Sequence, residues 1–340
     1  MEKPTILIVA PISRGYVSKL NADPRIAKAQ QLPQELWLCF NEMCGRGVEG
    51  ALEGPGPLAP FFAEADVIVC WDLPHGSVTW APRLKWVQAW SAGTDGIRPS
   101  GVFEAGIPVT NLTGVHAIPI AEHVLMMMLI LARDYKAFEK GARGRQWLSS
   151  DAVNELYEKT VGVVGLGSIG RRVAKVCRGL DMRVIATRRT ATAQQSNVQG
   201  ADELLKSSDL PSLLEQSDFV VLSCPLTPET RGLIGEKELR TMKSTAFLIN
   251  IARGEVVDEP ALKLALKEGW IAGAGLDVFW NEPMEQESEL WDMPNVVMTP
   301  HMANTSPSEE ARAAAIFDDN LARFIAGEPL RNLVDPGLGY

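Results

Sequence analysis

Residues 160–170 have the sequence TVGVVGLGSIG, in which Gly165, Gly167 and Gly170 follow the spacing G-x-G-x-x-G. The valines before the first glycine are typical of a buried parallel strand, and apolar residues at helical spacing follow over 171–180. In such a unit the first glycine permits a tight turn, the second lets the backbone approach a pyrophosphate, and the third lets helix and strand pack closely. Free N–H groups at the helix start can then hold phosphate oxygens.

The surroundings of this loop favour a dinucleotide site over an empty glycine-rich turn, which the bare spacing would also fit. A second strand is expected at 182–187, directly after the helix. It brings the chain to the ribose position about twenty residues after the first glycine. The stretch therefore predicts a nucleotide-binding domain.

Length and charge limit the remaining possibilities. With 340 residues the chain is too long for one ordinary core, which indicates two domains. The formal net charge is −9 and no long Lys/Arg run offsets it, so neither nucleic acid nor an anionic membrane is an expected partner. The longest apolar run, 124–132, is too short to span a bilayer.

The cysteines and the start of the chain predict a cytoplasmic protein. The five cysteines are scattered and never form a C-x-x-C pair. We expect buried thiols in a reducing compartment, with no disulfide and no metal site. The first residues lead directly into a short strand and lack the pattern of a signal peptide.

The order of apolar runs predicts two α/β domains. Short strands alternating with helices in the first part indicate a small, largely parallel sheet, and residues 45–60 are expected to form a loop. Further strands after the glycine-rich loop, with helices between most of them, indicate a doubly wound domain. The expected strands are 5–10, 36–40, 67–70, 86–89 and 109–111, then 182–187, 219–223, 246–250, 272–276 and 296–298.

Two long helices and an irregular arm complete this outline. The helix expected at 118–133 is apolar on more than one face, which favours burial in the molecule or at a subunit contact. Its His123 is expected to be a core or interface histidine and not a ligand. The polar stretch 141–159 could be an arm that packs on a second subunit, and 308–327 is an amphipathic helix.

Three polar residues stand at or shortly after expected strand ends: Arg253, Glu282 and His301. Such positions line the ligand crevice of open α/β sheets. Hydride chemistry on a 2-oxo acid needs a cation for the carboxylate, a proton donor for the carbonyl oxygen and an anion beside that donor. Taken singly, these residues could also be a surface ion pair, a solvated acid and a hydrogen-bonded histidine. Residues 91–95, SAGTD, could offer backbone N–H groups to an anion or form an ordinary turn.

Across nearly its whole length the chain resembles the D-isomer-specific 2-hydroxyacid dehydrogenase family, which includes glyoxylate and hydroxypyruvate reductases. The matching sequence motifs occur in the same order as in the family, which makes the resemblance specific. They are SAGTDGI (91–97), NLTG (111–114), AEH (121–123), VVGLGSIG (163–170), PLTPETRGLI (225–234), LINIARGEVVDEPAL (248–262), GAGLDVF (273–279), NEP (281–283), TPH (299–301) and NLVDPGLGY (332–340).

The resemblance implies a Rossmann-type doubly wound cofactor domain inserted in a flavodoxin-like α/β substrate domain. The cofactor domain is then 113–302, and the substrate domain is 1–112 plus 303–340. With the apolar helix and the arm as candidate subunit contacts, we expect a homodimer.

Site roles follow from the same resemblance. Arg253 matches the arginine that holds the substrate carboxylate and carbonyl, Glu282 the catalytic glutamate, and His301 the acid/base histidine. The backbone at Ala92 and Gly93 falls on the carboxylate-binding loop. The cofactor positions implied are Gly165, Gly167, Ser168, Ile169, Gly170, Pro225, Thr230, Ile251, Ala252 and Asp277, the last near the nicotinamide carboxamide.

The sequence departs from the family pattern in two places. Glu158 replaces the glycine usual just before the Lys-Thr that opens the fingerprint strand, which puts the local turn in question. After His301 the chain continues Met-Ala-Asn-Thr where small residues or glycines are common. Asn304 is therefore a candidate substrate contact.

The ribose position predicts NADP, with NAD as the other possibility. NAD-specific enzymes place an acid after the second strand to bind the ribose hydroxyls. Here Thr187, Arg188 and Arg189 follow, with no acid. This is either a solvated basic turn or a site for a 2′-phosphate, and we expect NADPH to be preferred.

The expected reaction is reduction of a 2-oxo acid to its (R)-2-hydroxy acid by hydride from a nicotinamide, with His301 giving the proton and Glu282 holding His301. Two alternatives remain at this point. One is a non-catalytic dinucleotide-sensing binder on the same scaffold. The other is a dehydrogenase of another small anion, such as formate or phosphite.

Overall fold

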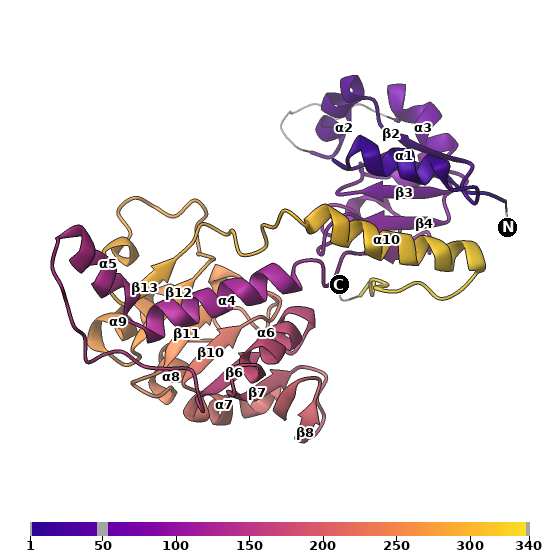
Figure 1. Ribbon diagram of the computed structural model, residues 1–340. Coiled ribbons are helices and arrows are strands. Elements are labelled where there is room, and N and C mark those ends of the chain that lie inside the picture. The colour runs from indigo at the N-terminus through magenta and orange to yellow at the C-terminus, as the bar shows by residue number, and fades with distance from the viewer. Residues whose placement is uncertain (1, 46–53, 338–340) are drawn as a thin grey trace. The chain divides into compact units, whose positions relative to one another are not determined.

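The computed structural model describes residues 2–45 and 54–337. The chain divides into two compact units (Figure 1). Unit 1 comprises Met1–Val115 and Pro307–Tyr340, and unit 2 is the continuous segment His116–Ser306. Within the described part of the chain, no helix is both long and apolar enough to cross a membrane.

Unit 1 is built on a five-stranded sheet with the order β2-β1-β3-β4-β5. All neighbouring strands pair in parallel, and this is the strand order of flavodoxin-like folds. Its strands are β1 (Thr5–Val9), β2 (Lys28–Gln31), β3 (Val67–Cys70), β4 (Trp86–Ala89) and β5 (Val109–Thr110).

Helices cover both faces of this sheet. One face packs against α1 (Arg14–Ala22) and α10 (Glu309–Ala326), where the Trp86 ring stacks on Phe317 with centroids 5.4 Å apart. The other face packs against α2 (Trp37–Met43) and α3 (Ala59–Ala63). The remaining elements of unit 1 are short 3₁₀ helices: η1 (Gln34–Leu36), η2 (Gly56–Leu58), η3 (Ser77–Trp80) and η4 (Arg98–Ser100).

Unit 2 is built on an eight-stranded sheet with the order β13-β12-β11-β10-β6-β7-β9-β8. All pairs are parallel except β8 with β9, which form an antiparallel hairpin at one edge. The strands are β6 (Thr160–Val164), β7 (Arg183–Arg188), β8 (Gln195–Val198), β9 (Ala201–Lys206), β10 (Phe219–Leu222), β11 (Phe247–Asn250), β12 (Gly273–Leu276) and β13 (Val296–Met298).

Two helical layers enclose this second sheet. One apolar cluster joins a face of the sheet to α4 (Ala117–Ala132) and α6 (Ser168–Arg178). A second joins the opposite face to α7 (Leu210–Gln216), α8 (Glu236–Thr241) and α9 (Glu259–Glu268). Because the strands are parallel, the loops that leave their carboxyl ends gather at one edge, where ligands bind in doubly wound folds. The other elements are α5 (Tyr135–Arg143), η5 (Ser207–Asp209), η6 (Gly254–Val256) and η7 (Glu289–Asp292).

The expected α/β class with parallel sheets is confirmed, but individual elements differ from prediction. The strand expected at 36–40 is wrong, because these residues enter helix α2. Trp37 and Phe40 are three residues apart and their ring centroids are 6.4 Å apart, while Leu38 is 70% exposed. One side of this apolar run is therefore exposed to solvent, which is typical of a surface helix and not of a buried strand.

Three strands, β2, β8 and β9, were not predicted because their sequences are largely polar. The second strand of unit 1 is β2, with the sequence KAQQ, and the edge hairpin is formed by β8 and β9. Edge strands bury less surface, so they carry a weak hydrophobic signal. The expected loop 45–60 lies partly outside the described residues, and its later part enters η2 and α3. The expected arm 141–159 begins within α5, which ends at Arg143.

Candidate active site

The glycine-rich loop joins β6 to α6. Gly165 has a φ of 101°, and a Cβ there would lie 2.8 Å from the backbone nitrogen of Cys224. A Cβ at Gly170 would lie 2.2 Å from the carbonyl oxygen of Gly165. At Gly167, by contrast, a Cβ would meet nothing within 4 Å, and no side chain caps α6 there. The open space and uncapped helix start fit a phosphate group. The first turn of α6 contains the other two predicted residues, Ser168 and Ile169.

The predicted ribose residues lie at the end of β7. Thr187 is 4% exposed, and its carbonyl oxygen accepts hydrogen bonds from the N–H groups of Gly165 (3.1 Å) and Leu166 (3.0 Å). The backbone of Thr187 in β7 therefore holds the glycine-rich loop in position. Arg188 is half-buried, and its Nε has no hydrogen-bond partner among the described residues. Arg189 is exposed. A guanidinium with an unused N–H group is suited to binding an anion.

The predicted cofactor residues after β10 and β11 lie in ordered loops at the same sheet edge. The Thr230 hydroxyl donates to the carbonyl oxygen of Pro225 at 2.7 Å and accepts from the N–H of Thr227 at 2.8 Å. Pro225 and Thr230 therefore belong to one closed turn. Ile251 and Ala252 are buried directly after β11.

Arg253 is exposed in the loop between β11 and η6, and its Nη1 donates to the carbonyl oxygen of Ala252 at 2.7 Å. Asn250, 1% exposed, shapes this loop by accepting from the N–H of Ala252 (3.0 Å) and donating to the carbonyl oxygen of Arg253 (3.0 Å). A Cβ at Gly254 would lie 2.0 Å from the carbonyl carbon of Phe279. Glycine therefore lets the arginine loop approach the loop that carries Glu282.

Glu282 and His301 form a hydrogen-bonded pair. Oε2 of Glu282 lies 2.7 Å from Nδ1 of His301, and Oε1 accepts from the N–H of Phe279 at 3.0 Å. The bond at Nδ1 leaves Nε2 as the other proton-carrying position of the ring. His301 has a φ of 55°, an uncommon backbone conformation for this residue type. The side-chain contact and the backbone conformation together set the orientation of His301.

The surroundings favour the charged form of Glu282. Burial raises the pKa of this carboxyl, but the hydrogen bonds from His301 and the Phe279 N–H oppose it. The charges of His301 and Arg253 act in the same direction, and the net result is a pKa below the ordinary value. Glu282 is therefore an anion beside the imidazole at neutral pH.

Asp277 holds the loop that carries His301. This carboxylate is 2% exposed, and Oδ1 accepts from the Thr299 hydroxyl (2.6 Å) and the N–H of Met302 (2.9 Å). Oδ2 accepts from the N–H of Ala303 at 3.0 Å, and the carbonyl oxygen of Asp277 accepts from the N–H of His301 at 2.8 Å. These bonds give Asp277 a structural task within the protein, and its predicted contact with the cofactor stays a prediction.

His123 extends this network from helix α4. Its Nε2 lies 2.8 Å from Oγ1 of Thr299. Because the single Thr299 hydroxyl proton goes to Asp277, the His123 nitrogen must be the donor, which fixes the Nε2–H tautomer. Burial lowers the pKa of His123, and the charge of Asp277 opposes this only in part. His123 is therefore a neutral, hydrogen-bonded histidine.

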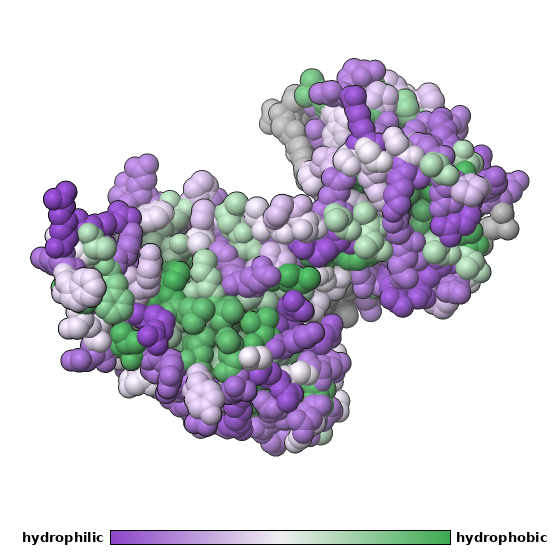
Figure 2. Space-filling view, viewed as in Figure 1, coloured by the Kyte–Doolittle hydropathy of each residue, from purple (hydrophilic) through white to green (hydrophobic). Residues whose placement is uncertain are grey.

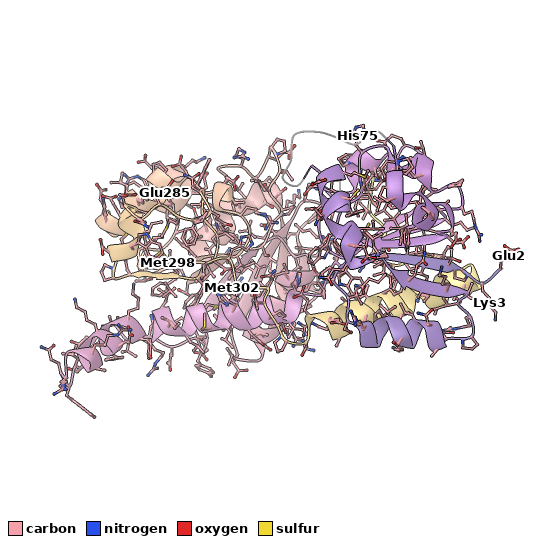
Figure 3. All side chains as sticks on the ribbon, turned by 90° about the horizontal axis from the view of Figure 1, so that it is seen from above. Glu2, Lys3, His75, Glu285, Met298 and Met302 are labelled. Atoms are coloured by element: carbon pink, nitrogen blue, oxygen red, sulfur yellow. The ribbon has the colours of Figure 1, made fainter. Side chains whose placement is uncertain are left out.

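A cavity of 490 Å³ opens beside the Glu282 and His301 pair. Its wall is mainly apolar. Figure 3 labels Met298, which ends β13, and Met302 in the loop after His301. Met298 lines the cavity, and the N–H of Met302 donates to Asp277. The other apolar lining residues are Phe279, Pro283, Met284, Trp291 and Pro300.

The remaining predicted substrate residues are exposed or half-buried. In unit 1, Ala92 and Gly93 follow β4 and are exposed, with their carbonyl oxygens bonded to Nδ2 of Asn111 (2.8 Å) and Oγ of Ser91 (2.6 Å). Both carbonyl oxygens are thus held by hydrogen bonds, in a turn that is open to solvent. In unit 2, Asn304 is half-buried in the loop after His301.

The departure at Glu158 does not alter the site. Glu158 has a φ of 57°, the left-handed region that glycine adopts without strain. Its N–H donates to the carbonyl oxygen of Asp181 at 3.3 Å, which joins the residues before β6 to the turn before β7. The glutamate therefore adopts here a backbone conformation that glycine adopts more readily.

Comparison with known proteins agrees with this geometry. Residues 125–303 match the model of the D-isomer specific 2-hydroxyacid dehydrogenase NAD binding domain. A glyoxylate reductase of Pyrococcus furiosus is 40% identical over 263 residues, which span 75% of this chain and 77% of the relative. The chain belongs to the D-isomer specific 2-hydroxyacid dehydrogenase family. It is an NAD(P)-dependent 2-hydroxyacid dehydrogenase.

Solved structures of this dehydrogenase family are similar over almost the whole chain. A member from Xanthobacter autotrophicus Py2, in complex with NADPH and MES, has a TM-score of 0.76 and 33% identity, covering 99% of this chain and 100% of that one. An NADPH-dependent glyoxylate/hydroxypyruvate reductase from Sinorhizobium meliloti, with NADP and sulfate, has a TM-score of 0.74 and 26% identity, covering 99% and 100%.

Sequence reasoning missed several residues that shape the dehydrogenase site. Asn250 and Thr299 are polar residues at the ends of apolar strands, and this contrast is the signal that could have indicated them. None of the five cysteines forms a disulfide. Over residues 2–45 and 54–337, no group of three or more His, Cys, Asp or Glu side chains is arranged to hold a metal.

Proposed function

We propose that this dehydrogenase reduces a 2-oxo acid to its (R)-2-hydroxy acid, with Arg253, Glu282 and His301 as the catalytic residues. The observation that carries the proposal is the 2.7 Å contact between Glu282 and His301, in the same unit as the glycine-rich loop. A proton donor paired with an anion meets a need of carbonyl reduction that simple dinucleotide binding does not have.

Each residue has a distinct task in this reaction. Arg253 binds the substrate carboxylate and polarises the carbonyl through charge-assisted hydrogen bonds. His301 gives its proton to the carbonyl oxygen as the alcohol forms, and Glu282 orients the ring and stabilises its charged form. The bound nicotinamide dinucleotide supplies the hydride. Backbone N–H groups at Ala92 and Gly93 and the side chain of Asn304 are proposed further substrate contacts.

We propose glyoxylate as a substrate, because the relative from Pyrococcus furiosus is named a glyoxylate reductase. NADPH is the proposed preferred cofactor. Arg188 and Arg189 stand where an NAD-specific enzyme would place an acid, and the structures described above contain NADPH or NADP. Pro225, Thr230, Ile251, Ala252 and Asp277 are proposed to line the dinucleotide site.

The proposed division of labour assigns substrate binding to 1–112 plus 303–340 and cofactor binding to 113–302. A homodimer is proposed on the apolar surface of α4, where Met126 is 38% and Leu129 is 41% exposed. Figure 2 shows hydrophobic residues gathered over α4. Trp147, which is fully exposed, follows in the adjoining arm. A cytoplasmic location is proposed from the scattered cysteines, none of which forms a disulfide.

Initial rates with a panel of substrates test the reaction. The panel contains glyoxylate, hydroxypyruvate, pyruvate and bulkier 2-oxo acids with NADPH or NADH, and formate and phosphite with NADP or NAD. We expect turnover of 2-oxo acids and faster rates with NADPH. Turnover of formate or phosphite alone would indicate a dehydrogenase of another anion, and cofactor binding without any turnover would indicate a non-catalytic binder.

A further inference from the structure

Gln199 joins two arginines from different elements. Its Oε1 accepts from Nη1 of Arg188 at 3.1 Å and from Nη1 of Arg171 at 3.3 Å. Arg188 ends strand β7, and Arg171 lies in the first turns of helix α6. The two guanidinium groups thus meet at one neutral oxygen. We call Arg171, Arg188 and Gln199 the arginine clamp.

The β8–β9 hairpin puts Gln199 in this position. Val198 pairs with Ala201, so Gln199 and Gly200 form the turn between the strands. Gly200 has a φ of 92°, and a Cβ there would lie 3.7 Å from the Cβ of Ala174 in α6. The turn therefore packs directly on α6, the helix that follows the glycine-rich loop.

The arginine clamp carries positive charge without a carboxylate to neutralise it. Among the described residues, the side chains of Arg171 and Arg188 donate hydrogen bonds to Gln199, neither pairs with a carboxylate, and Nε of Arg188 is buried without a partner. Two guanidinium groups near one neutral acceptor repel each other, and an anion between them removes the repulsion. Phosphate offers several oxygens to such paired forks.

We propose that the arginine clamp binds the 2′-phosphate of NADPH, with Arg171 as a second guanidinium contact and Gln199 as a positioning residue. The inference rests on the proposed cofactor preference and extends it to two residues outside the ribose turn of β7. Gln199 is suited to the task because its amide aligns the arginines without supplying the negative charge that would repel a phosphate.

Binding of nucleotide fragments to the full chain tests Arg171 without catalysis. The probes are adenosine 2′,5′-bisphosphate and adenosine 5′-monophosphate, measured by calorimetry. We expect Arg171→Gln to weaken the bisphosphate by about tenfold and to leave the monophosphate unchanged. The control is Arg178→Gln, which removes the same charge from the far end of α6, where Arg178 lies 3.7 Å from Asp202. Equal effects of the two variants on the bisphosphate would overturn the role of Arg171.

Cofactor kinetics test the positioning role of Gln199. Gln199→Glu keeps the shape and adds a negative charge, so the KM for NADPH should rise by about tenfold or more while kcat and the KM for NADH stay unchanged. Gln199→Met removes the acceptor without adding charge, and a smaller rise is expected. Arg188→Ala, the reference, should raise the KM for NADPH by about 10- to 100-fold. Equal impairment with both cofactors would instead show that Gln199 only supports the fold.

These results are separable from the reaction itself. If the unmodified protein turns over 2-oxo acids but binds both nucleotide fragments equally, the proposed role of the arginine clamp is wrong and the proposed reaction stands. If it binds the bisphosphate more tightly through Arg171 but turns over no 2-oxo acid, the clamp stands and the proposed reaction is wrong.

Discussion

The hydroxyl of Thr299 donates a 2.6 Å hydrogen bond to Oδ1 of the buried Asp277. Thr299 stands two residues before His301, so this bond ties the proposed proton donor to strand β12. The same hydroxyl oxygen accepts from His123. One threonine therefore links helix α4, the end of β12 and the loop of His301 in a single network.

Replacing Thr299 by valine should damage this network while keeping the side-chain shape. The Nε2–H of His123 then loses its acceptor, which costs about 1–3 kcal/mol of unfolding free energy. Since Asp277 also loses a donor, the loop of His301 is less well placed, and kcat should fall by about tenfold. Thr299→Ser retains the hydroxyl and should behave as the unmodified enzyme. Thermal unfolding and initial rates measure both effects, and a fully active valine variant would contradict the network's role.

Changing Glu282 to glutamine should move the pH profile of reduction. Reduction needs a protonated donor, so kcat/KM falls as pH rises. Removing a negative charge 2.7 Å from Nδ1 disfavours the protonated ring, and the falling limb should move to lower pH. The limb is not the titration of Glu282 itself, because the pKa of that carboxyl lies below its ordinary value. If the limb stays in place in the glutamine variant, Glu282 does not tune the donor.

Substitution of Arg253 should abolish most activity. Arg253→Ala removes the cation proposed to bind the carboxylate, and kcat/KM should fall by about a hundredfold or more. Arg253→Lys should restore little, because a lysine cannot reproduce the planar two-pronged contact. The control Arg231→Lys changes an arginine in the preceding loop that lies 3.7 Å from Glu255, and it should retain activity. Near-normal kcat/KM in either Arg253 variant would remove this residue from the site.

Acid stability should depend on Asp66 in unit 1. This carboxylate is buried, and it accepts hydrogen bonds from the Thr5 N–H (3.0 Å), Lys85 (2.9 Å) and Arg83 (3.0 Å). Burial raises the pKa of Asp66, but these partners together lower it by more, so the net pKa lies below the ordinary value of 3.8.

Because the folded pKa is depressed, the charge of Asp66 stabilises the fold above pH 3.8, and this contribution disappears as pH falls through the folded value. Asp66→Asn should therefore cost about 1.5–3 kcal/mol at neutral pH. Urea unfolding at several pH values measures the difference between the two proteins. It should shrink in strong acid, and a constant difference would contradict the assignment.

The sequence was most informative where chemistry and pattern coincide. The glycine spacing around Gly165 and the apolar strands of unit 2 predicted the α/β class, because buried parallel strands need continuous apolar runs. It was least informative at polar sheet edges, so β2 and the β8–β9 hairpin were missed. Gln199 lies in that hairpin, and its contact with Arg171 and Arg188 depends on a turn that no local motif marks.

The partners of the site were harder to predict than the reactive residues themselves. Arg253, Glu282 and His301 stand after strand ends and carry charges suited to the reaction. Asn250, Thr299 and His123 act through hydrogen bonds across the unit, and such contacts depend on packing that spacing alone does not contain. The roles of these three residues therefore became clear only from the three-dimensional structure, which shows their hydrogen-bond partners.

The stack of Trp86 on Phe317 has a consequence for how the chain is synthesised. It joins a strand made early to helix α10, which is made only after the whole continuous unit 2. On the ribosome, the sheet face that bears Trp86 is therefore covered by α1 alone, without α10, while unit 2 emerges and folds. A nascent chain paused at that stage presents an apolar surface to chaperones, and the N-terminal segment of unit 1 is the part that needs their protection longest.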